Sequence, residues 1–307
     1  MAHLQQPAAA ARPVHLVESC GSKQCVYAES EAEEQYLCSV CACGAGRGVR
    51  GSRAELWRAA AAEAVCTALL VLLTCLPGSA DAPLLQRALA SGLLVAALVQ
   101  CFDQVSGAMM NPAVTLAATV AGRVGAARGA ALAAAQAAGA LAGGAALQAL
   151  RPGAAAACCT RPAPALPHAQ FQSLFVSYCI VSERVVLQAA CVEALLGAVL
   201  ALVNCAAWDA RNRRLLDSWP LRVGLTVAAL TLAAGDLTGA SINPARSLAP
   251  ALFSGDWNAQ WVYCVGPLCG ALCGAVLYRC VWRAPPSAPA RGLDPAPRVA
   301  PRPGQSK

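Results

Sequence analysis

The stretch Gly107-Ala108-Met109-Met110-Asn111-Pro112-Ala113-Val114-Thr115 recurs in altered form as Gly239-Ala240-Ser241-Ile242-Asn243-Pro244-Ala245-Arg246-Ser247. Both copies contain Asn-Pro-Ala after a Ser-Gly or Thr-Gly pair, and both open a short apolar run. Asn is a favoured N-cap, and Pro is favoured at the first helical position. Each copy is therefore predicted to begin a short helix that is capped by an amide side chain.

The spacing of two further residues indicates an internal duplication. Asn243 lies 132 residues after Asn111, and Glu193 lies 130 residues after Glu63. Each Glu sits inside a long apolar segment, at a matching distance before its Asn-Pro-Ala. Glu63 at the membrane surface is the alternative for that residue, and the paired spacing argues against it. A repeat of this length in an apolar chain is typical of a membrane protein with two related halves.

Composition supports a membrane protein and argues against a nucleic-acid partner. Of 307 residues, 57% are hydrophobic and only 13% are charged, whereas soluble domains carry about 25% charged residues. The net charge is +7, but the basic residues lie between apolar segments, which favours a role in topology. Most of the 17 Cys lie inside apolar segments, where a free Cys behaves as a small hydrophobe. We therefore expect no disulfide framework.

The apolar segments predict an all-α membrane protein with six transmembrane helices and two re-entrant half-helices in an inverted repeat. The half-helices end near residues 122 and 253, are too short to span, and must leave on the side from which they came. The predicted spans are at about 56–76, 84–101, 125–150, 185–208, 221–234 and 261–282. Gly139 and Gly143 are spaced for close helix contact, as are the three Gly residues of the last span.

Two half-helices of opposite orientation would meet N-terminus to N-terminus near the membrane midplane. Each N-terminus carries about half a positive charge, so the pair would repel cations and protons but not neutral solutes. The side-chain carbonyls of Asn111 and Asn243 would cap the helices and leave their NH2 groups free to donate to a solute. Arg246 is a charge inside the membrane, which is costly and usually functional. Glu63 and Glu193 would accept hydrogen bonds from the non-helical backbone before each half-helix.

These motifs resemble the aquaporins, the major intrinsic protein family, over about residues 55–282. The resemblance implies the aquaporin fold and a homotetramer with one pore in each subunit. It implies that the two Asn-Pro-Ala copies, Asn111-Pro112-Ala113 and Asn243-Pro244-Ala245, meet in that pore. It also implies that Arg246 is the Arg of the narrow outer filter, with no metal and no cofactor.

The rest of the implied filter departs from the water-selective pattern. Alignment places Ser91 where water-selective members usually have Phe, Thr231 where they have His, and Ala240 where Cys is common. Ser247, Ala251 and Tyr263 nevertheless resemble the water branch. A similar loss of the filter His occurs in insect channels that carry glycerol and urea. We therefore expect a passive channel for water, glycerol and urea, with a strict water channel as the alternative.

Two other classes remain alternatives. An ion-coupled secondary transporter would need charged residues along a path, and only Glu63, Glu193 and Arg246 are expected inside the membrane. A junctional or signalling protein with a disused pore is disfavoured by the intact motifs. An enzyme is not expected, because the membrane part of the sequence shows no pair of a nucleophile and a base.

The predicted organisation is a disordered cytoplasmic tail at residues 1–52, a channel domain at 53–282 and a second such tail at 283–307. The repeat halves are at about 53–150 and 185–282. Cys38-x-x-Cys41 is half of a zinc-like pattern, but lipidation or simple disorder is favoured because no second pair or His lies near. Arg residues cluster on one face of the six-span arrangement, so the positive-inside rule places both termini in the cytoplasm. The lipid bilayer, here expected to be the plasma membrane, is thus a partner and nucleic acid is not.

Overall fold

Six long helices form the framework of the protein, and each is long and apolar enough to cross a membrane. The computed structural model describes residues 52–77, 82–158, 160, 162, 183–215 and 217–283. The long helices are α2 (Arg53–Cys75), α3 (Leu84–Ser106), α5 (Ala126–Leu150), α7 (Glu183–Ala207), α8 (Trp219–Thr238) and α10 (Val262–Leu277), which a π turn (η3, Tyr278–Trp282) extends. The predicted six spans are therefore confirmed, with α3 and α8 each several residues longer than the sequence indicated.

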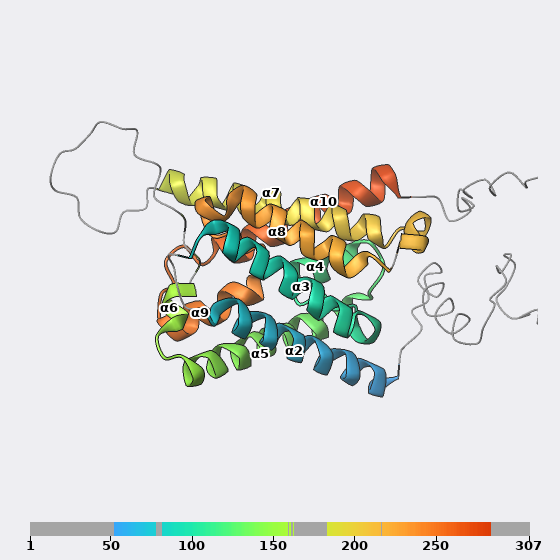
Figure 1. Cartoon of the computed structure of the whole chain (residues 1–307). Coiled ribbons are helices and arrows are strands. Elements are labelled where there is room, and N and C mark those ends of the chain that lie inside the picture. Colours follow the sequence, from blue (N-terminus) through green and yellow to red (C-terminus); the bar gives the residue numbers. More distant parts are fainter. Residues whose placement is uncertain are drawn as a thin grey trace, which may run out of the picture. The chain divides into compact units, whose positions relative to one another are not determined.

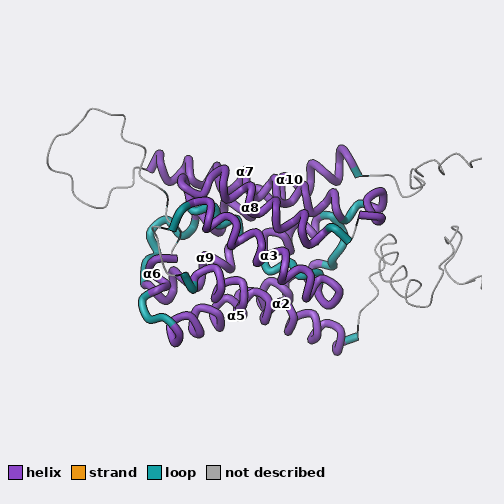
Figure 2. The backbone as a smooth tube through the Cα atoms, viewed as in Figure 1, coloured by secondary structure: helices purple, strands orange, loops and turns teal. Residues whose placement is uncertain are grey.

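Two short helices begin at the Asn-Pro-Ala copies, α4 (Pro112–Val120) and α9 (Pro244–Ser254). Figure 1 shows α4 toward one end of the long helices and α9 toward the other, as an inverted repeat requires. The remaining elements are a five-residue helix, α6 (Ala154–Cys158), and a 3-10 turn, η2 (Ala210–Leu215). The described residues contain helices and loops but no strand (Figure 2). The predicted all-α class with two half-helices is what the structure contains.

The long helices pair by small-residue contact in a pattern that repeats in both halves. A Cβ on Gly139 or Gly143 of α5 would collide with the Ala64 or Ala68 carbonyl of α2. In the second half, a Cβ on Gly270 of α10 would collide with the Ala194 carbonyl of α7. Lipid tails are as apolar as the helix surfaces, so close backbone packing supplies the attraction between the helices. The Gly spacing thus had the predicted consequence.

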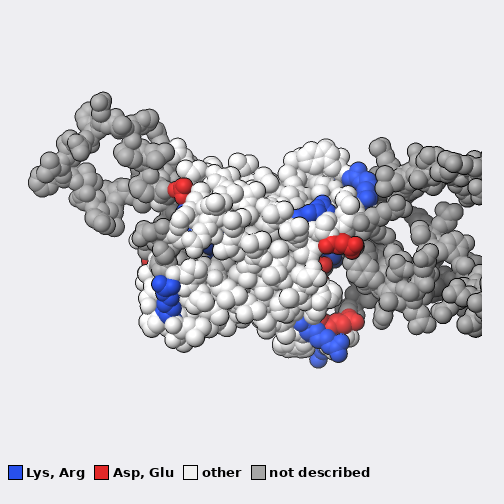
Figure 3. Space-filling model, viewed as in Figure 1, with Lys and Arg blue, Asp and Glu red and all other residues white. Residues whose placement is uncertain are grey.

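Charge is distributed as a membrane requires. In the face shown in Figure 3, acidic and basic side chains lie at the two ends of the helices, and the band between them is uncharged. Large apolar side chains are exposed along this band, among them Leu93 and Leu195 at 58% and 64% exposure. Their exposure is expected where lipid or another subunit covers the surface.

From the sequence we expect no disulfide framework, and the structure corrects this at one position. Cys75, at the end of α2, is bonded to Cys158 of α6, with 5.3 Å between the Cα atoms and 83 residues between them in sequence. The residues that follow α5 fold back as α6 against the end of α2, which sequence spacing does not reveal. Apart from Ser52 and Arg283, the predicted tails lie outside the described residues. The Cys38-x-x-Cys41 pattern and residues 163–182 of the loop between α6 and α7 also lie outside them.

Candidate functional site

The two half-helices begin with the same capping geometry. Asn111 Oδ1 accepts from the Ala113 N–H at 2.8 Å, and Asn243 Oδ1 accepts from the N–H groups of Ala245 and Arg246 at 2.9 and 3.2 Å. The next residue in each copy is a Pro at the first helical position, where its missing N–H costs nothing. The amide oxygens thus stabilise the helix starts, as the sequence predicts.

The amide nitrogens join the two halves to each other. Asn111 Nδ2 donates to the Ile242 carbonyl at 2.9 Å, and Asn243 Nδ2 donates to the Met110 carbonyl at 2.8 Å. The sequence-based expectation that both NH2 groups are wholly free is therefore corrected. An amide NH2 has two hydrogens, so one donor on each Asn remains for a solute. The reciprocal bonds also hold the two helix N-termini close together.

The backbone before each half-helix is strained, and a buried carboxylate holds it. In the first half, Ala108 and Met110 have φ of 41° and 51°, values that L-residues seldom adopt. Glu63, which is 0% exposed, accepts from the Met109 and Met110 N–H groups at 2.9 and 2.8 Å. It also accepts from Ser106 Oγ at 2.7 Å.

The second half repeats this arrangement at matching positions. Ala240 and Ile242 have φ of 45° and 56°. Glu193, also 0% exposed, accepts from the Ser241 and Ile242 N–H groups at 3.0 and 2.8 Å and from Thr238 Oγ1 at 2.7 Å. The two Glu residues therefore occupy equivalent places in an internal two-fold arrangement.

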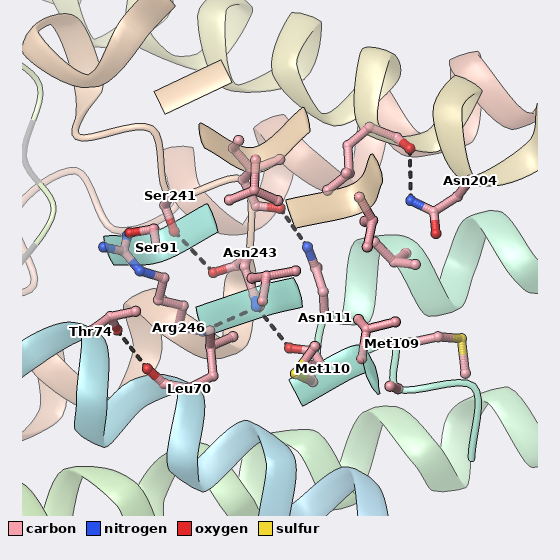
Figure 4. Close-up of a pocket in the computed structure, with 18 of the residues that line it drawn as sticks. Leu70, Thr74, Ser91, Met109, Met110, Asn111, Asn204, Ser241, Asn243 and Arg246 are labelled. Atoms are coloured by element: carbon pink, nitrogen blue, oxygen red, sulfur yellow. Dashed lines mark hydrogen bonds between the residues drawn. The ribbon is translucent and has the colours of Figure 1, made fainter. Parts of the chain in front are cut away.

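A cavity of about 70 Å³ runs past both Asn residues. A single water needs about 10–15 Å³, so the cavity has room for several in a row. Figure 4 shows Arg246 and Ser91 at one end, Asn111 and Asn243 in the middle and Asn204 at the other end. Thr231 and Ala240 also line this cavity, so the structure brings all four residues of the implied filter to one cavity.

Arg246 is the one charged side chain among the described residues that line the cavity. Its Nη1 atom is buried and has no hydrogen-bond partner among the described residues. A guanidinium carries five N–H donors and no acceptor, and Arg246 lines the cavity, so those of its donors that reach the cavity can bind a passing oxygen. Thr231 Oγ1 donates its own proton to the Val227 carbonyl at 2.8 Å, which leaves its lone pairs as acceptors.

Outside the membrane, an ion pair fixes the turn between α7 and α8. Asp209 accepts from Arg211 Nε and Nη2 at 2.9 and 2.8 Å and from the Tyr278 hydroxyl at 3.1 Å. Burial raises the pKa of the Asp209 carboxyl, but these hydrogen bonds outweigh burial and lower the pKa to about 2. The pair anchors η2 against the end of α10.

The sequence model of the family described as "Major intrinsic protein" matches residues 50–278. The chain belongs to this family. It is 37% identical to the human lens fiber major intrinsic protein over 231 residues, which cover 73% of this chain and 81% of that protein. It is 46% identical to a rice protein described as probable aquaporin TIP4-2, over 96 residues that cover 31% of this chain and 38% of that protein. The X-ray structure of the aquaglyceroporin from Plasmodium falciparum superposes with a TM-score of 0.62 at 21% identity, covering 74% of this chain and 96% of that one.

Three groups of this major intrinsic protein support the loops, a role that the sequence did not indicate for any of them. Gln136 is 0% exposed and donates through Nε2 to Glu63 at 2.7 Å and to Thr115 Oγ1 at 2.9 Å. The Tyr263 hydroxyl donates to the Thr238 carbonyl at 2.8 Å. A chain of hydroxyls joins Thr160, Ser247 and Ser241, with 2.9 Å between the first two oxygens. Isolated polar residues in apolar segments were the signal that would have found Gln136 and Tyr263.

Proposed function

We propose that this major intrinsic protein is a passive channel for water and small neutral solutes such as glycerol and urea. One observation carries the proposal, namely a single cavity that is lined by Arg246, Ser91, Thr231 and Ala240 together with the paired Asn residues. Arg246 and Ser91 lie at one end of it and the two Asn residues near its centre (Figure 4). The cavity offers fixed donors and acceptors and room for a file of water. Among its described lining residues, Arg246 carries the only charge, which disfavours the ion-coupled transporter.

The channel excludes cations and protons in this proposal. The N-termini of α4 and α9 face each other across the Asn111 and Asn243 bonds, and each contributes about half a positive charge. Arg246 adds a full charge at the filter end. A cation would cross both barriers without a compensating carboxylate in the cavity lining, whereas a neutral solute would not be repelled.

The filter admits solutes larger than water because its walls lack aromatic rings. Ser91 and Thr231 are small, and Thr231 Oγ1 can accept a hydrogen bond from a hydroxyl or amide. A three-carbon polyol can thus donate to Thr231 and accept from Arg246. In this respect the filter resembles that of the insect channels that carry glycerol. Water-branch residues Ser247 and Tyr263 support the alternative of a strict water channel, although both act in loop support and do not line the cavity.

Stopped-flow permeability of proteoliposomes tests this proposal, with water, glycerol and urea as solutes and empty liposomes as the baseline. We expect all three to pass above that baseline. The double variant Ser91→Phe and Thr231→His should suppress glycerol while much of the water flux remains. If the wild type passes water but no glycerol or urea, the strict water channel is correct. A flux that depends on Na⁺, on pH or on voltage would favour the secondary transporter.

The resemblance to the aquaporins supports a homotetramer, and we place it in the plasma membrane with both termini in the cytoplasm. The exposed apolar side chains of the long helices suit contact with lipid and with neighbouring subunits. Mass determination in detergent tests the assembly. Protease accessibility of the tails in oriented vesicles tests the orientation.

A further inference from the structure

Asn204 places a buried side-chain oxygen in the cavity far from the filter. It lies on α7 three residues before the helix ends and is only 4% exposed, yet it lines the cavity. Its Nδ2 donates to the Leu200 carbonyl at 2.9 Å. Because a carbonyl only accepts, this bond fixes the amide orientation and turns Oδ1 away from the helix. Figure 4 shows the Asn204 oxygen directed away from the hydrogen bond that its amide nitrogen makes.

This oxygen has no partner in the part of the chain that the structure describes. Within the described residues no hydrogen bond to Asn204 Oδ1 is formed. In the described part of the chain, only two side-chain polar atoms are both fully buried and without a hydrogen-bond partner, namely Thr67 Oγ1 and Arg246 Nη1. Asn204 Oδ1 is not one of them, although it has no partner either. Asn204 Oδ1 is therefore open to the cavity and available to whatever occupies it.

The surroundings of Asn204 make its oxygen distinctive. The turn η2 connects the end of α7 to the start of α8, so Asn204 and Trp219 lie at the same end of the cavity. On this side of the paired Asn residues, Asn204 supplies the only side-chain oxygen among the described lining residues. Met109 lies on this side as well (Figure 4), and further apolar or aromatic lining residues are Val99, Leu200, Trp219 and Val223.

We propose that Asn204 Oδ1 is a second solute-binding position, which accepts a hydrogen bond from neutral solutes rich in N–H or O–H donors and favours urea over water. This assignment rests on the proposed function. Arg246 and the remaining donors of Asn111 and Asn243 can serve a solute oxygen, whereas urea carries four N–H groups and one oxygen. A water in a file can donate both of its hydrogens to neighbouring waters, whereas urea has four N–H donors and therefore depends more on acceptors in the wall. Asn204 lowers the cost of removing water from those N–H groups.

A matched pair of variants isolates the oxygen. Asn204→Thr keeps a group that can donate to the carbonyl four residues earlier and leaves lone pairs to accept from a solute. Asn204→Val has the same shape without either property. Asn258→Leu serves as the control for loss of an Asn, because Asn258 is exposed and distant from the cavity lining. Urea and water permeability are measured on the same proteoliposomes, so their ratio is independent of the amount of protein inserted.

We expect Asn204→Val to lower the ratio of urea to water permeability about three- to tenfold, the factor that the loss of one uncharged hydrogen bond produces. Asn204→Thr and Asn258→Leu should stay within about twofold of the wild type. An Asn204→Val protein with the wild-type ratio, or equal losses in the Val and Thr variants, would overturn the role of this oxygen and leave the channel function intact. A wild type that passes water but no urea would overturn the preference for urea. A wild type that passes neither would overturn the proposed function itself.

Discussion

Replacing Glu63 by Leu should unfold the first pore loop, and the structure sets the size of the effect. Glu63 accepts from two backbone N–H groups, those of Met109 and Met110, whose residues are only 7% and 2% exposed. Leu would leave both donors buried without a partner, at about 1–3 kcal/mol each. The loss is therefore about 2–6 kcal/mol, against a typical total stability of about 5–15 kcal/mol. The bonds that Ser106 Oγ and Gln136 Nε2 donate to Glu63 at 2.7 Å are lost as well, whereas Gln136 Nε2 keeps its bond to Thr115 Oγ1 at 2.9 Å.

Thermal unfolding of the purified protein in detergent, monitored by size exclusion after heating, measures this loss. Glu55→Leu is the matched control, because Glu55 is exposed and, among the described residues, accepts only from the Ser52 N–H at 2.9 Å. Its loss should therefore cost less than about 1 kcal/mol. Glu63→Gln should fall between the two, since one oxygen still accepts. The ratio of glycerol to water permeability of the surviving Glu63→Leu protein should be unchanged. If Glu63→Leu unfolds at the same temperature as Glu55→Leu, the carboxylate does not hold the loop.

The remaining predictions concern ions, pH and redox state. Proteoliposomes under a pH gradient should swell osmotically without losing the gradient, and a rapid protein-dependent proton leak would contradict the barrier formed by Arg246 and the half-helix ends. The pKa of Asp209 is lowered to about 2, so its ion pair should stabilise the protein fully above about pH 4, and this stabilisation should be lost as the pH falls through 2. The difference in unfolding temperature between the wild type and Asp209→Asn should therefore shrink from about pH 4 to about pH 2. A constant difference would argue against a stabilising role for the ion pair. Reduction of the Cys75–Cys158 bond should lower the unfolding temperature, because the bond closes a loop of 83 residues. Chain entropy gives an upper limit of about 4–5 kcal/mol for the stability that the bond contributes. Cys75→Ser should show the same lower unfolding temperature with or without reductant, and a further fall on reduction would assign the effect to other cysteines.

Much of the fold is encoded locally and could be predicted from the sequence. Apolar segments of about 20 residues predict transmembrane helices, because a segment that crosses the bilayer must form its backbone hydrogen bonds internally and a helix does so within one segment. Asn111 and Asn243 specify helix starts because the cap and the following Pro act within three residues. The duplication, read from Asn111, Asn243, Glu63 and Glu193, specified the inverted repeat.

What the sequence could not give depends on contacts between segments far apart in the chain. The two Asn nitrogens bond to Ile242 and Met110 of the opposite half, and nothing near either Asn indicates that partner. The bond between Cys75 and Cys158 depends on where α6 folds, and 17 Cys residues allow many pairings. Asn204 reads in the sequence as one polar residue in an apolar span. Only the packing of α7 beside α8 and the two pore loops turns its oxygen toward the cavity, because the face that a helix buries is decided by its neighbours.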